Sequence, residues 1–250
     1  MHTEDGVVSP DKVTTIRHVS INRGIEWIAA GFNLLMKKPA EFIIAGLVLC
    51  VITFVLNFMP VMGSAMAVMV GVVAAGAFML ACRALEEGQD PLLAAQKAPN
   101  ITPLWILSLI AAGLGLAVGF LGLMLAGGVM AAAFASPMLA MGLGAISVIV
   151  MLLISIPMLM ALWLAPGLLV LKGVDPITAL RLSFAAAAKN FPAFIVFYVL
   201  AWIATFVGAM LLGIGLIFVY PVLLCASYFA YKEIFGTVSG GEAVGFIPAP

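Results

Sequence analysis

The sequence predicts an all-α, polytopic helical membrane protein with about six transmembrane helices in three helix-pair units, each preceded by a cytoplasmic interfacial amphipathic helix. Of the 250 residues, 65% are hydrophobic and 9% are charged, and the mean hydropathy is +1.26. Soluble domains are about a quarter charged. Residues 42–82, 98–171 and 190–231 contain no Asp, Glu, Lys or Arg. Most of the surface must therefore face lipid.

The first and third uncharged windows each hold two spans, because a helix of about 20 apolar residues crosses about 30 Å of hydrocarbon. The first window divides near residues 57–63, where Pro60 and Gly63 favour a turn. The third divides at the GIG sequence of residues 213–215. The longer middle window holds one span over about residues 104–125 and another over about residues 146–171.

Residues 126–145 lie between these two middle spans and have a different composition. They begin with paired glycines, contain Pro137 and are rich in Ala and Gly. This composition favours an interfacial or re-entrant hairpin. An additional span, which would give seven or eight in total, and an external loop remain open alternatives.

The distribution of charge supports six spans. With six, all 11 Lys and Arg residues fall on one face of the membrane. Because cytoplasmic loops are enriched in Lys and Arg, both termini are predicted to be cytoplasmic. The expected organisation is a flexible polar tail over residues 1–20, a single integral membrane domain over residues 21–236 and a flexible tail over residues 237–250. The first 20 residues lack the pattern of a cleavable signal peptide.

Two polar loops contain the same helix-start sequence. The loops read EEGQDPLLAAQKAPNITPLW and LKGVDPITALRLSFAAAAKNFPAF. In each, an aspartate can accept from free backbone N–H groups, and the proline that follows lacks an N–H at a position where none is needed. Asp90 with Pro91 and Asp175 with Pro176 are therefore predicted to start short helices. These features predict an internal repeat, although ordinary connectors could share the same cap chemistry.

The segment NRGIEWIAAGFNLLMKKPAEF resembles the same unit without Asp-Pro and has amphipathic spacing. Trp27 suits the headgroup region, and Lys37 and Lys38 can meet phosphate groups. Cytoplasmic-face cations are the candidate contacts to anionic lipids, at about 1 kcal/mol each, although they could instead only set topology. These cations are Arg23, Lys37, Lys38, Arg181 and Lys189.

Small residues and prolines mark candidate packing positions. Gly115 and Gly119 form a GxxxG pattern, which favours close helix approach within the chain or in a homo-oligomer. Pro157, Pro166 and Pro221 lie inside spans, where each is predicted to kink or end its helix.

The pattern GVDPITALRLSFAAAAKNFPAF, followed by two spans and YFAYKEIFG, resembles bacterial six-span inner-membrane families over residues 165–236. These include the YciC type and the membrane domains appended to some glycerophosphodiester phosphodiesterases. The resemblance implies an inner-membrane location and a poorly defined role. No catalytic motif accompanies it, since the phosphodiesterase chemistry lies in a separate soluble domain.

The residues themselves predict no catalytic, metal or cofactor site. The span interiors carry no ionisable Asp, Glu, Lys, Arg or His, and the two histidines lie in the N-terminal tail. The three cysteines are far apart in sequence, which argues against a disulfide framework or a zinc site. A net charge of zero gives no expectation of a nucleic-acid partner. The expected role is a non-catalytic envelope protein that interacts with lipid or binds a membrane-protein partner. The alternative is a transporter or channel for a neutral or apolar solute or lipid.

Overall fold

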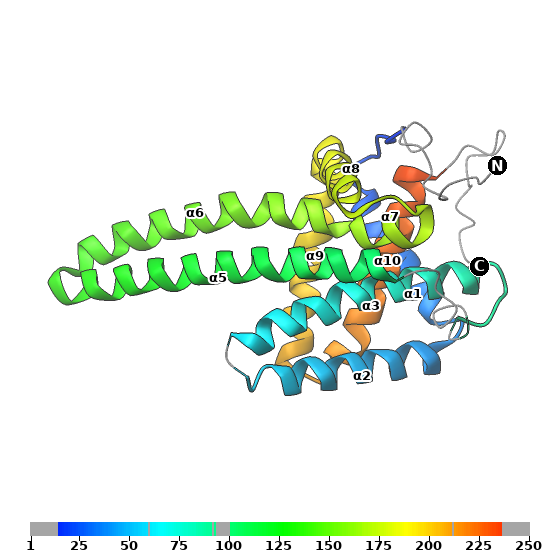
Figure 1. Cartoon of the computed structure of the whole chain (residues 1–250), viewed down its shortest axis with the longest axis horizontal. Coiled ribbons are helices and arrows are strands. Elements are labelled where there is room, and N and C mark those ends of the chain that lie inside the picture. Colours follow the sequence, from blue (N-terminus) through cyan, green and yellow to red (C-terminus); the bar gives the residue numbers. More distant parts are fainter. Residues whose placement is uncertain (1–14, 60, 92, 94–100, 212, 237–250) are drawn as a thin grey trace, which may run out of the picture.

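The computed structural model describes residues 15–59, 61–91, 93, 101–211 and 213–236. Within these ranges every regular element is a helix, which confirms the predicted all-α class. The elements, labelled in Figure 1, are α1 (Arg23–Leu35), α2 (Pro39–Leu56), α3 (Met62–Glu86), α5 (Thr102–Ala135), α6 (Pro137–Trp163), α7 (Ala165–Lys172), α8 (Pro176–Lys189), α9 (Phe191–Met210) and α10 (Leu216–Phe235). The predicted C-terminal tail and most of the N-terminal tail lie outside the described residues.

In the described part of the chain, six helical segments are long and apolar enough to cross a membrane, as predicted, and the chain is a multi-pass membrane protein. They are Pro39–Leu56, Met62–Glu86, Thr102–Ala135, Pro137–Lys172, Phe191–Met210 and Leu216–Phe235. The first pair turns between Leu56 and Met62, and the last pair turns between Met210 and Leu216. Both turns lie near the predicted positions, and Gly213 has the positive φ of a turn glycine. Gly63, in contrast, already belongs to α3.

Residues 126–145 do not form an interfacial or re-entrant hairpin, so that prediction is wrong. They extend the two neighbouring helices, which meet at Ser136. The backbone of Ser136 is extended, and Pro137 starts α6, where its missing N–H costs no hydrogen bond. The 34 residues of α5 give a helix about 50 Å long. Figure 1 shows this α5–α6 hairpin projecting well beyond the other helices.

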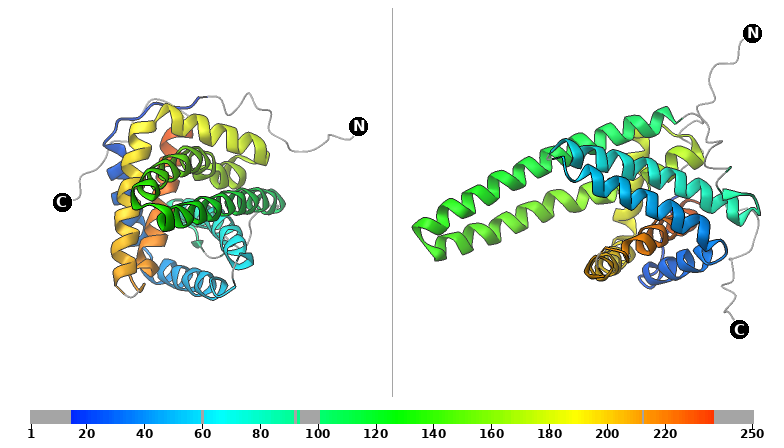
Figure 2. Two further views of the ribbon diagram at one scale, coloured as in Figure 1. Left: turned by 90° about the vertical axis from the view of Figure 1, so that its left-hand side faces the viewer. Right: turned by 90° about the horizontal axis from the view of Figure 1, so that it is seen from below.

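The six apolar segments do not form one parallel bundle. In Figure 1, α2, α3, α5 and α6 run in broadly similar directions, whereas α9 and α10 run across them. Both views in Figure 2 agree with this crossing. The short helices α1, α7 and α8 gather at the end of the molecule opposite the tip of the α5–α6 hairpin. This end carries the charged side chains and most of the core.

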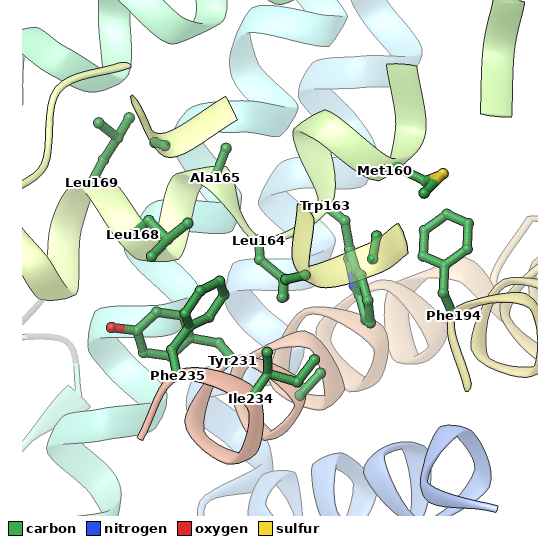
Figure 3. Close-up of a cluster of buried hydrophobic side chains, with 14 of the residues drawn as sticks. Met160, Trp163, Leu164, Ala165, Leu168, Leu169, Phe194, Tyr231, Ile234 and Phe235 are labelled. Carbon is green, nitrogen blue, oxygen red and sulfur yellow. The ribbon is translucent and has the colours of Figure 1, made fainter. Parts of the chain in front are cut away.

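The main core draws on seven helices, and at its centre lies a group of aromatic rings contributed by three of them. The Trp163 ring of α6 lies 5.7 Å from Trp27 of α1 and 5.3 Å from both Phe194 and Phe197 of α9, measured between ring centroids. Figure 3 shows Trp163 and Phe194 beside each other, with the fully buried Leu164 nearby. Offset and tilted ring pairs of this kind add about 0.5–1.5 kcal/mol each to the burial of apolar area.

Helix α1 is packed into this core along one side. Trp27 is only 2% exposed, so its ring faces the protein core and does not contact lipid headgroups as the sequence suggested. The helix turns its two glycines toward its neighbours, Gly24 toward α9 and Gly31 toward α10. Its other apolar side is left uncovered, with about half of each large side chain exposed; this side includes Ile25, Phe32 and Met36.

Candidate functional site

One candidate site is a set of polar side chains where α1 and α3 each pack against the end of α10. It is here called the polar base and is made of Arg23, Glu26, Glu86, Lys232 and Glu233. In its first half, Glu233 bridges two donors. Its Oε1 accepts from Arg23 Nε at 2.6 Å, and its Oε2 accepts from Trp27 Nε1 at 2.7 Å. Arg23 also pairs with Glu26. The hydrogen bond to Glu233 is the main cause that raises the pKa of Arg23.

The second half of the polar base joins α3 to α10. The Glu86 carboxylate accepts from the Tyr228 hydroxyl at 2.7 Å. It also accepts from Lys232 Nζ at 2.8 and 3.0 Å. Tyr228 is 5% exposed, so its hydroxyl needs this acceptor. The carboxylates of the polar base are thus occupied by internal donors, which indicates a structural role.

The five cations predicted to contact anionic lipids differ in what they bind. Arg23 is held by Glu233, Lys38 Nζ lies 2.9 Å from Glu41 Oε1, and Lys189 Nζ donates to the Ile16 carbonyl at 2.6 Å. The Glu41 hydrogen bond is the main cause that raises the pKa of Lys38. The other two predicted cations are exposed and make no ion pair within the described part of the chain. They are Lys37 and Arg181.

Both Asp-Pro sequences stand at helix starts. Asp175 Oδ2 accepts from the Thr178 N–H at 2.9 Å, and Pro176 is the first residue of α8. Hydrogen bonds from the Thr178 side chain and then its backbone lower the pKa of Asp175. Asp90 Oδ1 accepts from the Leu93 N–H at 3.2 Å, with Pro91 helical between them. The helix that would follow Pro91 lies mostly outside the described residues.

Asn190, between α8 and α9, holds the segment before α1 and was not singled out as a site by sequence reasoning. Its side chain is 1% exposed. Oδ1 accepts from the Val19 N–H at 2.8 Å, and Nδ2 donates to the Arg17 and Ala186 carbonyls. The end of the predicted N-terminal tail is therefore tied to the helices. A lone Asn between two helices gives no sequence signal for such a long-range clamp.

The three predicted kink positions have different surroundings. Pro157 and Pro221 lie inside helices that continue through them, and Pro221 packs against α2 at Gly46. Pro166 lies at the break between α6 and α7. There the buried Ser183 hydroxyl of α8 accepts from the Leu164 N–H at 3.0 Å.

The predicted GxxxG pattern lies where there is free space. A Cβ at Gly119 would meet nothing within 4 Å, and one at Gly115 would make an ordinary contact with Val68. The close approach is instead at Gly31, where a Cβ would lie 2.6 Å from the Ala226 nitrogen. This glycine belongs to a helix predicted to be interfacial, so its packing role had no clear sequence signal.

A second candidate site is a groove of about 650 Å³ at the end of the molecule away from the polar base, here called the lateral groove. It lies between α2, α3 and the start of α10 and is open on one side. Most of its wall is apolar and includes Leu47, Val51, Phe54, Ala67, Val68, Ile214 and Ile217.

The polar side chains of the lateral groove are largely turned back onto their own helix. The Thr53 hydroxyl donates to the Leu49 carbonyl at 2.8 Å, and Asn57 Nδ2 donates to the Thr53 carbonyl at 2.7 Å. Tyr220 of α10 adds a third polar group. Sequence reasoning missed the groove because its walls come from segments about 150 residues apart, and an apolar wall looks like any other part of a span.

In the residues that the structure describes, no group of three or more His, Cys, Asp or Glu side chains is placed to hold a metal ion. The lateral groove falls within the size range of pockets for small ligands, about 300–1,000 Å³. No protein-family model, curated protein sequence or solved structure matches this chain.

Proposed function

We propose that this chain is a non-catalytic, lipid-interacting protein of the bacterial inner membrane, with its polar base and both termini on the cytoplasmic side. In this proposal the lateral groove holds one acyl chain of a membrane lipid. The observation that carries the proposal is the groove itself, an open apolar concavity at the depth of the spans. The one-sided placement of the 11 cations supports the orientation.

The position of the groove favours a lipid from the leaflet opposite the polar base. Asn57 lies at the end of α2 that is farthest from the polar base, and it lines the groove. A lipid headgroup would therefore lie near Asn57, with its acyl chain running inward along Val51 and Leu47. Since lipid tails are as apolar as the groove, selection would come from shape and van der Waals packing.

The two exposed cations supply a separate contact with the cytoplasmic leaflet, on the same side as the polar base. Lys37 follows α1 and Arg181 lies on α8, and both are exposed. Both helices lie at the end of the molecule opposite the hairpin tip. Near an anionic surface each is worth about 1 kcal/mol. The other three predicted cations hold protein acceptors, so they contribute less to lipid binding.

Native mass spectrometry tests whether the groove binds a lipid. The protein is released from membranes together with its bound lipids and is then weighed. Replacing Ala67 by Trp fills the groove, and replacing the exposed Ala117 of α5 by Trp adds the same bulk elsewhere. We expect the amount of bound lipid to fall severalfold in Ala67→Trp and to be unchanged in Ala117→Trp. Equal lipid retention in both variants would contradict the proposal.

The alternative function, transport of a lipid, would use the same groove, and a different measurement distinguishes transport from binding. The protein is reconstituted in vesicles that contain a fluorescent phospholipid in one leaflet. If the protein only binds lipid, the fluorescent phospholipid should move between the leaflets at the same rate as in vesicles without protein. A rate that rises with protein content and falls in Ala67→Trp would favour lipid transport over simple binding.

A further inference from the structure

Two cysteines that lie far apart in the chain are in contact in the fold. Cys82 of α3 and Cys225 of α10 are both fully buried, and their sulfur atoms lie 2.9 Å apart. Both are free thiols. Their wide spacing gave no reason to expect a pair, since the contact depends on how α3 packs against α10. Ordinary side-chain contacts extend to about 4.0–4.5 Å between heavy atoms, so these sulfurs are unusually close.

The helices that carry the two cysteines are fixed on both sides of the contact. On the polar side, Glu86 lies one turn beyond Cys82 and accepts from Tyr228, three residues beyond Cys225. On the apolar side the link runs through α2. Phe78 of α3, one turn before Cys82, packs against Phe42 of α2 with ring centroids 5.9 Å apart. One turn further along α2, Gly46 lies against Pro221, one turn before Cys225 on α10. Because α3 and α10 are held together on both sides of the two cysteines, the two sulfur atoms are kept next to each other.

We propose that Cys82 and Cys225 are a disulfide-forming pair that joins α3 covalently to α10. The oxidant is a low-molecular-weight disulfide acting by thiol–disulfide exchange. One thiolate attacks the oxidant and releases its first thiol, and the second thiolate then attacks the mixed disulfide and releases the other. One S–S bond forms, one breaks, and the two protons end on the released thiols. The sulfurs must approach by less than about 1 Å, to about 2.05 Å.

The third cysteine provides an internal control. Cys50 of α2 is half-buried and lines the lateral groove. The proposal therefore predicts that Cys50 stays free when Cys82 and Cys225 are oxidised. The new bond would link the first and last helix pairs, and it would restrict the unfolded chain across the 143 positions between the two residues.

The test is a thiol count on the full-length chain. Because both thiols are buried, the chain is synthesised into membranes with either oxidised or reduced glutathione present. It is then denatured, alkylated with N-ethylmaleimide and weighed intact. We expect one alkylated cysteine per chain in the oxidised sample and three in the reduced sample. Three in both samples, a disulfide between two chains, or a disulfide that includes Cys50 would overturn the proposal.

Two variants keep the test independent of folding defects. Cys50→Ser leaves the pair untouched and is expected to give no alkylated cysteine when oxidised and two when reduced. Cys225→Ser is expected to give two in both conditions. Reduction should also lower the thermal midpoint of oxidised Cys50→Ser by about 5–15 °C, the shift expected from loss of a disulfide. If the oxidised and reduced samples of Cys50→Ser have the same thermal midpoint and the same number of alkylated cysteines, the result would contradict the proposed disulfide.

Discussion

The Ser183 hydroxyl is inserted into the backbone hydrogen bond that Leu164 would otherwise make within its own helix. It accepts from the Leu164 N–H at 3.0 Å and donates to the Met160 carbonyl at 2.8 Å. In an unbroken helix this N–H would donate directly to this carbonyl, four residues earlier. Insertion of a side chain is one of the known causes of a helix break. Here the break lies between α6 and α7, next to Pro166.

Replacing Ser183 by Ala should lower the free energy of unfolding by about 1–3 kcal/mol, the cost of leaving a buried polar group without a partner. Both Ser183 and Leu164 are fully buried, so water cannot replace the lost hydroxyl. Thermal unfolding in detergent measures the effect. Ser147→Ala removes a hydroxyl that bonds only to the exposed turn of its own helix, and it should change the midpoint little. Equal effects from the two substitutions would show that the inserted hydroxyl has no special role.

Gly31 and Gly119 should respond in opposite directions to Ala. At Gly31 the new Cβ would lie 2.6 Å from the Ala226 nitrogen and 2.7 Å from the Val222 carbonyl, so α1 must move away from α10. We expect a loss of about 1–3 kcal/mol from this overpacking. At Gly119 nothing lies within 4 Å, and Ala is the better helix former by about 0.5–1 kcal/mol. The thermal midpoints of both variants, measured in the same detergent assay, test this difference. A lower midpoint for Gly119→Ala would contradict it and would show that another segment packs against Gly119.

The fold class and the helix turns were predictable because they depend on local chemistry. Uncharged windows of known length define spans, and turn residues such as Gly213 mark where a window divides. The extension of α5 was not predictable in the same way. Paired glycines and Pro137 suggest a break, yet in an apolar setting a helix keeps its backbone bonds. Only Ser136 leaves the helical conformation there.

The site was less predictable because it depends on contacts between distant segments. Cap chemistry at Asp175 could be predicted from the next three residues. In contrast, the hydrogen bond between Arg23 and Glu233 could not be predicted, because the two residues lie 210 positions apart. The burial of Trp27 was missed for the same reason, since its acceptor is also Glu233.

Removing the Glu233 carboxylate should destabilise the chain more than removing its neighbour in the polar base. Glu233→Ala leaves the Trp27 N–H without its acceptor in a site that is 2% exposed, and it frees Arg23. We expect a loss of about 1–3 kcal/mol. Glu26→Ala removes only the exposed ion pair with Arg23, one turn away on α1. It should lower the free energy of unfolding by less than about 0.5 kcal/mol. Trp27→Phe in the Glu233→Ala background should recover part of the loss, because the ring then has no N–H to satisfy.

The Asp175 cap should make stability depend on acid pH. Its pKa is lowered in the folded chain by hydrogen bonds from Thr178. The contribution is therefore fully present above the usual carboxyl pKa of about 3.9, and it is lost as pH falls through the lower folded pKa. Asn is a comparable cap that does not ionise. Asp175→Asn should thus be slightly less stable than the natural chain at pH 7, with a difference under about 1 kcal/mol, and this difference should close below about pH 4. A gap that widens in acid would contradict the cap assignment.

The α5–α6 hairpin is longer than a bilayer is thick, so its tip should emerge from the hydrocarbon. Leu114 lies 12 positions into α5, about 18 Å from its start, and Phe134 lies at about 48 Å. Even a tilt of about 40°, the upper end for membrane helices, leaves Phe134 beyond a core of about 30 Å. Phe134 is also 90% exposed.

Cysteine labelling in the Cys50→Ser background tests this placement. We expect a membrane-impermeant maleimide to label Phe134→Cys in intact vesicles and to leave Leu114→Cys unlabelled. Lysine substitution should agree, because a cation near the bilayer centre costs about 2.5–3.5 kcal/mol on insertion scales. Leu114→Lys should therefore lower the yield of inserted protein, whereas Phe134→Lys should not. If Phe134→Cys is protected and Phe134→Lys fails to insert, the tip must be covered by lipid or by another protein. The hairpin would then lie much flatter in the membrane than the direction of α2 and α3 implies.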